Sequence, residues 1–125
     1  MRRLFVMTHQ FDRQWQAMGL TDPDLVRLQQ GILENPQIGP VIPGTGRLRK
    51  LRFAFEGQGK RGSIRVAYVD FSLYEIVYLI TAYPKSEKDN LSKAERNAIK
   101  KQIDAIEAAL AKSHSTEEKQ EKGRK

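Results

Sequence analysis

Residues 44–69, GTGRLRKLRFAFEGQGKRGSIRVAYV, decide the fold, because they predict two β-strands joined by a glycine-rich turn. In the first strand, residues 47–55, apolar and basic side chains alternate: Leu51, Phe53 and Phe55 share one face, and Lys50 and Arg52 share the other. In the second strand, residues 62–70, one face carries Ile64, Val66 and Tyr68 and the other carries Arg65 and Ala67. The hairpin therefore has two different faces: an apolar face that packs against a core and a cationic face that does not.

The same segment holds nearly all of the excess positive charge. The chain has a net charge of +7, and residues 44–65 contain seven basic residues against one glutamate. Scattered lysines would indicate only a solubilising surface. A localised basic field is instead the electrostatic footprint of a partner that carries phosphate groups.

Length and composition exclude several classes of protein. The 125 residues are enough for one domain with a single modest core. The absence of cysteine excludes disulfides, thiol catalysis and cysteine-based zinc sites. With only His9 and His114, we expect no metal site and no serine–histidine triad, and therefore no cofactor. No apolar run approaches the roughly 18 residues of a membrane span, so we expect a soluble, cytoplasmic protein that has no membrane partner.

The segment before the hairpin predicts one strand and two helices. Residues 3–7 predict a short strand, and residues 8–18 place Phe11, Trp15 and Met18 on one helical face, so we expect Trp15 to anchor the core. The second helix is predicted to begin with Asp22 as its N-cap and to end at Asn35, with Leu25, Leu28 and Ile32 as its buried stripe. The short turn between the helices indicates a helical hairpin. Residues 36–46 contain three prolines and three glycines and are a predicted loop.

The segment after the hairpin predicts a strand and a long helix. Residues 75–83 are almost continuously apolar, which is typical of a strand that is well covered. Ser92 and Glu95 fit a capping box at the start of the helix. Its apolar residues repeat every three to four positions, at Ile99, Ile103, Ile106 and Leu110.

These elements predict an α+β fold: an N-terminal strand and helical hairpin, an antiparallel sheet of about four strands, and a C-terminal helix. We expect the helices on one face of the sheet, so that its other face or its rim carries Lys50, Arg52 and Arg65. Residues 1–112 form the expected domain. Residues 113–125, SHSTEEKQEKGRK, lack apolar side chains and are expected to be a disordered charged tail.

One nucleotide-binding pattern occurs by chance. Gly57, Gly59 and Gly62 have the GxGxxG spacing, but they lie between two predicted strands. A dinucleotide-binding fingerprint has to open a helix, so a glycine-rich hairpin loop explains these residues better.

Three segments in register resemble the HigB branch of the RelE/ParE toxin superfamily: GTGRLRKLR (44–52), GKRGSIRVAY (59–68) and ITAYPKSEKDNLS (80–92). The resemblance extends over roughly residues 3–110. It implies the toxin of a type II toxin–antitoxin module that cleaves mRNA in the ribosomal A site. It also implies a cognate antitoxin with a helix-turn-helix domain as a partner, and contact with operator DNA only through the antitoxin complex.

RNA cleavage by its own 2′-hydroxyl needs removal of that proton, stabilisation of a highly charged phosphorane-like state and protonation of the leaving 5′-oxygen. Without histidines or a metal, lysines and arginines must supply all three. Neighbouring cations and desolvation lower the pKa of a lysine, which makes Lys50 the first candidate for proton transfer. Arg65 suits a bidentate grip on phosphate oxygens, and Arg52 and Arg61 are expected to assist.

The resemblance assigns the same residues. Lys50 and Arg52 match the basic second strand of the family, Arg65 matches the arginine of the third, and Lys85 and Lys88 match the basic loop after the fourth. These five residues are the predicted catalytic set. The predicted RNA-binding residues are Arg49, Lys60, Arg61 and Tyr83.

The chain departs from the family at three places. RelE proper has a base-stacking tyrosine near the start of its last helix, where this chain has Ser92. Tyr83 is the candidate to replace it, because an aromatic face binds bases with little regard to their sequence. Pro84 and Arg47 stand where the family has glycine, so the local loops are expected to differ.

Two other functions are compatible with the same fold. ParE-like relatives inhibit DNA gyrase through protein contact, and a basic α+β domain can also bind RNA without cleaving it. The arginine of the third strand, with Lys50 opposite, favours the ribonuclease. A pure binding module would need aromatic platforms on the sheet face where this chain has Lys50, Arg52 and Arg65.

Overall fold

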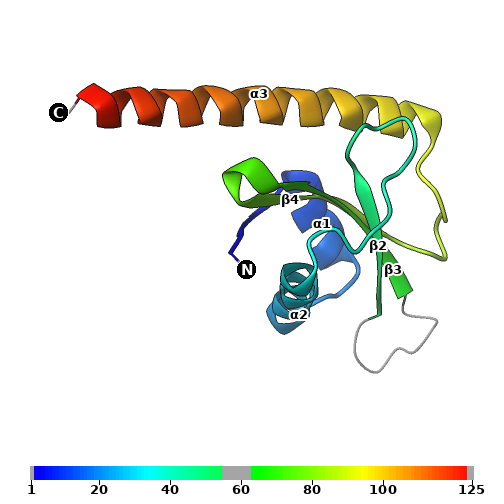
Figure 1. Cartoon of the computed structure of the whole chain (residues 1–125). Coiled ribbons are helices and arrows are strands. Elements are labelled where there is room, and N and C mark those ends of the chain that lie inside the picture. Colours follow the sequence, from blue (N-terminus) through cyan, green and yellow to red (C-terminus); the bar gives the residue numbers. More distant parts are fainter. Residues whose placement is uncertain (1, 55–62, 124–125) are drawn as a thin grey trace.

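The structure, a computed structural model, describes residues 2–54 and 63–123, with the backbone alone beyond residue 114. Some residues that the sequence analysis names lie outside the described part of the chain: Phe55, Gly57, Gly59, Lys60, Arg61 and Gly62. Figure 1 shows the element order: β1 (Leu4–Met7), α1 (His9–Ala17), α2 (Asp22–Glu34), β2 (Arg49–Ala54), β3 (Ser63–Phe71), the short 3-10 helix η2 (Ser72–Tyr74), β4 (Ile76–Pro84) and α3 (Lys93–Gly123).

The sheet has four strands in the order β1-β4-β3-β2. Strands β2, β3 and β4 pair antiparallel along the chain, as predicted. Strand β1 differs from the expectation of an antiparallel sheet, because it pairs parallel to β4, with Leu4 opposite Ile76. A strand of four residues carries no local signal for its pairing direction, which depends on where the two helices return the chain.

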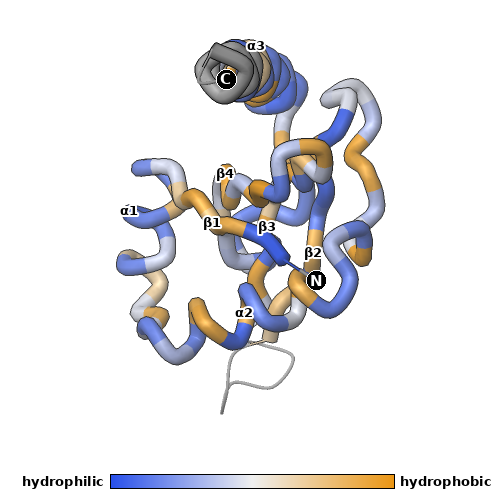
Figure 2. Tube along the Cα trace, turned by 60° about the vertical axis from the view of Figure 1, so that its left-hand side comes forward, coloured by the Kyte–Doolittle hydropathy of each residue, from blue (hydrophilic) through white to orange (hydrophobic). Residues whose placement is uncertain are grey.

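Helices cover both faces of the sheet. Figure 2 shows α3 on one side of the strands and α1 and α2 on the other. The expectation that all helices lie on one face is therefore wrong. The physical reason is that β3 and β4 bury apolar side chains at consecutive positions, and a strand that is apolar on both faces needs a cover on each.

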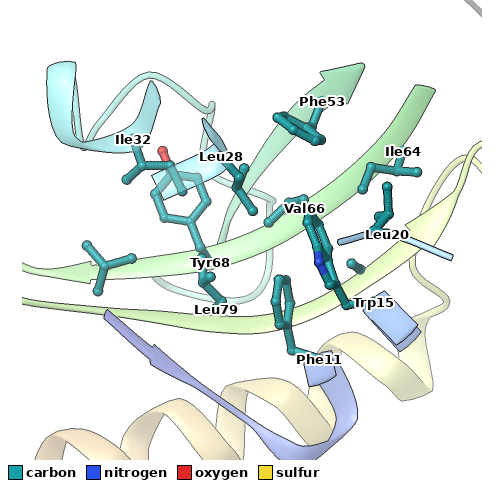
Figure 3. Close-up of a cluster of buried hydrophobic side chains, with 12 residues drawn as sticks. Phe11, Trp15, Leu20, Leu28, Ile32, Phe53, Ile64, Val66, Tyr68 and Leu79 are labelled. Atoms are coloured by element: carbon teal, nitrogen blue, oxygen red, sulfur yellow. The ribbon is translucent and has the colours of Figure 1, made fainter. Parts of the chain in front are cut away.

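The core under α1 and α2 is built around aromatic rings (Figure 3). Trp15 is buried and stacks on Phe11 at 5.3 Å between ring centroids, so its predicted role as a core anchor is confirmed. The predicted apolar face of β3 also packs here, with Ile64, Val66 and Tyr68 all buried.

The core under α3 contains the opposite face of β3. Ala67 packs there with Val69, Ile80 and the helix residues Ile99 and Ile103, which confirms the predicted stripe of α3. The helix continues to Gly123, whereas we expected a disordered tail after residue 112. Adding residues to an existing helix needs no new nucleation, which favours the continuation of α3.

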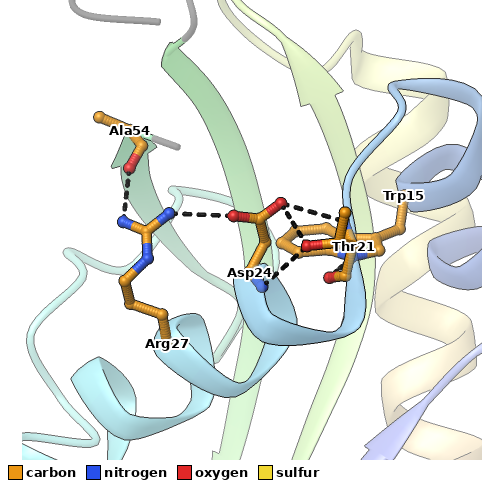
Figure 4. A network of polar contacts seen from close by, with 5 residues as sticks. All are labelled: Trp15, Thr21, Asp24, Arg27 and Ala54. Atoms are coloured by element: carbon orange, nitrogen blue, oxygen red, sulfur yellow. Dashed lines mark hydrogen bonds and ion pairs between the residues drawn. The ribbon is translucent and has the colours of Figure 1, made fainter. Parts of the chain in front are cut away.

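Helix α2 begins one residue earlier than predicted, because its N-cap is Thr21 and not Asp22. The Thr21 hydroxyl accepts a hydrogen bond from the Asp24 N–H, and the Asp24 carboxylate accepts one from the Thr21 N–H. This reciprocal capping box satisfies two backbone donors, which a cap at Asp22 would not. Arg27 extends the network, since it donates to Asp24 and to the carbonyl of Ala54 at the end of β2 (Figure 4).

Gly39 should not tolerate a side chain. A Cβ atom there would lie 2.6 Å from the carbonyl oxygen of Lys50 and 3.3 Å from the Tyr68 ring. We expect Gly39→Ala to lower the free energy of unfolding by about 1–3 kcal/mol, because backbone and a packed ring must move. Urea titration followed by circular dichroism measures this loss.

Gly31→Ala is the matched control for that measurement. Gly31 lies inside α2 with nothing within 4 Å of an added Cβ, so alanine should stabilise the protein by about 0.5–1 kcal/mol. Equal effects of the two substitutions would contradict the close approach of residue 39 to β2.

Candidate functional site

The cationic side chains of the hairpin share one face of the sheet. Arg52 on β2 lies directly opposite Arg65 on β3, and Arg65 lies opposite Tyr83 on β4. Lys50 was expected opposite Arg65, but the strand register places it opposite Ala67, on that same face, the one that α3 covers further along the strands. Side chains at opposite positions of paired strands are neighbours on one face. The structure thus brings Lys50, Arg52 and Arg65 together.

These three residues line a depression of about 410 Å³, which we call the cationic depression. Its walls are residues 38–40 of the loop before β2 and Asp89 of the segment after β4. Lys50, Arg52 and Arg65 all belong to paired strands, so strand register sets their positions.

Arg65 is held rigidly at the site. Its side chain is only 5% exposed, and its two terminal nitrogens donate to Asp89 Oδ1 at 3.1 Å and to Ser63 Oγ at 3.3 Å. The Asp89 side chain is 63% exposed. A phosphate group entering the depression could therefore replace this carboxylate without unfolding anything around it.

Lys50 and Arg52 differ in their surroundings. Lys50 is half-buried, and its Nζ donates to Asn90 Oδ1 at 2.9 Å. Arg52 is exposed, and among the described residues its guanidinium makes no hydrogen bond or ion pair. Two arginines at directly opposed positions repel each other and destabilise the strand pair, so an anion bound between Arg52 and Arg65 would relieve that repulsion.

The other predicted catalytic lysines lie beside the depression and do not line it. Lys85 is exposed, and its backbone N–H donates to the carbonyl of Ser63 at 3.3 Å, which holds the segment after β4 against the sheet. Lys88 pairs with Glu95 and places its Nζ 5.2 Å from the centre of the Tyr83 ring. Both residues therefore border the site from the β4 side.

The position of Tyr83 does not fit the hypothesis that its ring stacks on an RNA base. Its side chain is 2% exposed, so neither face of the ring is open to a base. Its buried hydroxyl has no hydrogen-bond partner among the described residues. Burial raises the pKa of Tyr83, and the Arg65 charge partly opposes that rise. Tyr83 thus contributes an apolar support beneath Lys88 in this structure.

Arg49 lies on the opposite face of β2 from the cationic depression. Its guanidinium donates to the carbonyls of Gln37 at 3.2 Å and Gly39 at 2.8 Å, so it fastens the loop that forms one wall. The sequence pattern placed Arg49 with the RNA-binding residues because of its charge alone. Strand alternation directs it away from Lys50 and Arg52.

The two residues that stand in place of glycines have structural roles. Arg47 pairs with Glu107 of α3 and lies over the ring of Phe71, 5.6 Å from its centre, and so fastens the loop before β2 to α3. Pro84 ends β4, and its carbonyl accepts from the N–H groups of Glu87 and Lys88.

Sequence reasoning missed three polar residues at the site: Asp89, Asn90 and Arg96. The first two contact Arg65 and Lys50, and the third lines a neighbouring depression. No spacing rule identifies them, although all follow the basic loop closely. Across residues 2–54 and 63–114, no cluster of three or more potential metal-binding side chains occurs. The described helices include none that is long and apolar enough to span a membrane.

The start of α3 should be sensitive to acid. The capping box predicted there is confirmed: the Ser92 hydroxyl accepts from the Glu95 N–H, and the Glu95 carboxylate accepts from the Ser92 N–H. The hydrogen bond from Lys88, followed by that backbone bond, lowers the pKa of Glu95 below its ordinary value of 4.5. Its ionised form therefore stabilises the fold above the unfolded pKa, and this stabilisation is lost as the pH falls through the folded value.

We therefore expect Glu95→Gln to weaken the dependence of the melting temperature on pH below 4.5. Thermal melts across that range measure the difference from the wild type. Glu87→Gln, an exposed glutamate nearby, is the control and should melt like the wild type. Identical acid dependence in Glu95→Gln and the wild type would show that this capping box contributes no ionisation-linked stability.

Comparison with known proteins shows the family and the fold of the chain. The family model described as the RelE toxin of the RelE/RelB toxin–antitoxin system matches residues 2–122. Among solved structures, the chain is similar to a free E. coli toxin RelE mutant with two arginine-to-alanine substitutions. The TM-score is 0.51 at 15% sequence identity, and the match covers 71% of this chain and 90% of that chain. At such an identity the likeness shows the fold, which agrees with the α+β prediction.

Proposed function

Because the chain belongs to the RelE toxin family of RelE/RelB toxin–antitoxin systems, we propose that it is a ribosome-dependent endoribonuclease that cleaves mRNA and thereby inhibits translation. Within the family we assign it to the HigB branch, on the three sequence segments described above. A toxin of this family has a cognate antitoxin as its partner. We propose further that this antitoxin carries a helix-turn-helix domain, that only their complex contacts operator DNA, and that the toxin acts on ribosomes in the cytoplasm.

The observation that supports this function most is the opposition of Arg52 and Arg65 within the cationic depression. The repulsion between them costs stability in the free protein, and a phosphate between them would bring both charges into use. Guanidinium groups can grip phosphate oxygens with paired hydrogen bonds. Their charge would stabilise the additional negative charge that develops on the phosphate as the 2′-oxygen attacks.

Lys50 is the residue that we propose for proton transfer. Lys50 lines the same depression as both arginines, and its Nζ donates a hydrogen bond to Asn90. In the reaction, the 2′-hydroxyl loses its proton as its oxygen bonds to phosphorus, and the bond from phosphorus to the 5′-oxygen breaks as that oxygen gains a proton. Lys50 would serve one of these two transfers, and Lys85 or Lys88 at the border of the depression would serve the other. The chain's own side chains would then supply all three tasks without a metal ion.

Programmed ribosomes provide the direct test. The full-length protein is incubated with ribosomes carrying a defined mRNA, and the cut ends are mapped by primer extension. We expect cuts at the ribosomal A site and no cuts in the same message without ribosomes. An intact message, under conditions where the protein arrests growth, would reject the nuclease and point to another target such as gyrase. A message that is bound but intact would indicate a non-catalytic RNA-binding module.

A further inference from the structure

A second depression adjoins the cationic depression. It lies between residues 40–43 of the loop before β2 and the start of α3, and its volume is about 490 Å³. We call it the loop groove. Figure 1 shows this loop rising beside the first turns of α3. Lys50, Asn90 and Arg96 give the loop groove polar groups, and its other walls are apolar.

The two depressions are neighbours that share part of their lining. Lys50 and Pro40 line both the cationic depression and the loop groove, so Lys50 stands at the boundary between them. A chain bound between Arg52 and Arg65 would therefore pass Lys50 and enter the loop groove. A single nucleic-acid strand suits such a path, because it presents a negative charge at every nucleotide.

Arg96 is a cation without a partner in this groove. Its side chain is half-buried, and it makes no side-chain hydrogen bond or ion pair within the part of the chain that the structure describes. Lys93 and Lys100 are exposed and lie three and four residues away on the same helix, so they are its neighbours on the helix surface. Arg96 is thus the residue of α3 that lines the groove, and the two lysines add positive charge beside it.

The carboxylates closest along the chain do not cancel this charge. Asp89 is paired with Arg65, and Glu95 is paired with Lys88. Asn90, the remaining polar residue of the lining, is neutral and already accepts a hydrogen bond from Lys50. The groove therefore combines an available guanidinium with apolar walls, which is suitable for a phosphate and for the face of an adjoining base.

We propose that the loop groove binds the mRNA strand beside the cleaved phosphate, and that Arg96 holds a flanking phosphate there. This inference rests on the proposed function, because it extends the substrate path of that site. Arg96 would act in binding and not in the chemical step, since the cationic depression already contains the groups proposed for cleavage.

Binding of a short, fluorescently labelled single-stranded RNA to the full-length protein tests this inference. Arg96→Ala should weaken binding about tenfold, as expected for the loss of one charge-assisted hydrogen bond to phosphate. Since one phosphate contact is lost, the slope of log affinity against log salt should fall by about 0.7. Arg96→Lys should keep part of the affinity and most of the slope.

Lys101→Ala is the matched control. It removes one positive charge from the same helix, but five residues correspond to about 140° of rotation, so Lys101 faces away from Arg96. We expect its affinity and slope to stay close to the wild type. Equal losses in Arg96→Ala and Lys101→Ala would mean that only net charge matters, and this would overturn the proposal. So would an unchanged Arg96→Ala, or a wild-type protein that does not bind RNA.

Cleavage on programmed ribosomes separates this inference from the proposed function. If the wild type cleaves and Arg96→Ala binds RNA normally, the loop groove fails as a binding site while the nuclease stands. If the wild type does not cleave but Arg96→Ala shows the expected loss of binding, the nuclease fails while the RNA path stands.

Discussion

Replacing Arg65 with alanine should lower the rate of mRNA cleavage on programmed ribosomes about 10³-fold, because a preorganised donor at the reacting phosphate would be lost. Arg65 is the cation whose geometry is most constrained, held by Asp89 and Ser63 on a central strand. No nearby side chain can take its position, since Arg52 reaches the site from β2 with an exposed side chain. Single-turnover cleavage rates measure the effect.

The Arg65→Ala protein should remain folded and should still bind its antitoxin. The substitution leaves Asp89 without a partner, but that carboxylate is 63% exposed and stays hydrated. It also removes the repulsion between opposed arginines. Because the buried stem of the arginine is lost, we expect a small decrease in stability, which circular dichroism melts would report.

Two further variants make the result specific. Arg65→Lys keeps the charge but not the planar fork, so it should recover only a small part of the rate. Arg13→Ala removes an exposed arginine from α1, on the other side of the sheet, and should cleave like the wild type. If Arg65→Ala unfolds the protein, Arg65 is a structural residue. If it cleaves normally, the cationic depression is not the catalytic site.

Replacing Trp15 with alanine should lower the free energy of unfolding by about 3–5 kcal/mol. The indole is 5% exposed and lies between two aromatic rings, with Phe11 at 5.3 Å and Phe53 at 5.9 Å. Its Nε1 donates to the carbonyl of Thr21 at 3.2 Å, which ties the core to the start of α2. Because domains are typically stable by only about 5–15 kcal/mol, the loss would be a large part of the total.

Urea titration followed by circular dichroism measures this loss without depending on tryptophan fluorescence. Trp15→Phe keeps a ring in the core and should cost clearly less than alanine. Leu73→Ala changes a side chain that is 75% exposed and should be close to neutral. If Trp15→Ala were as mild as Leu73→Ala, the aromatic core would not be what fastens α1 and α2 to the sheet.

Local pattern predicted the elements well. The alternation assigned the faces of the described residues of β2 and β3 correctly, and the apolar repeat of α3 identified the residues that it buries. The capping box at Ser92 was also predicted. Each of these signals depends only on residues that are close together in the chain, so the sequence alone is enough to detect it.

The sequence by itself therefore determined the α+β elements, the resemblance to the toxin family, and the fact that Lys50 and Arg52 share one face of their strand. The pairing of β2 with β3 then decided that Arg65 lies on that same face. Only the tertiary structure decided which helices cover each face, that β1 runs parallel to β4, that Tyr83 is buried and that Arg49 supports a loop. It also decided that Asn90 and Arg96 reach the same space as Lys50. The physical reason is that periodicity describes the direction of a side chain relative to its own backbone. What that side chain meets depends on segments that are distant in the chain.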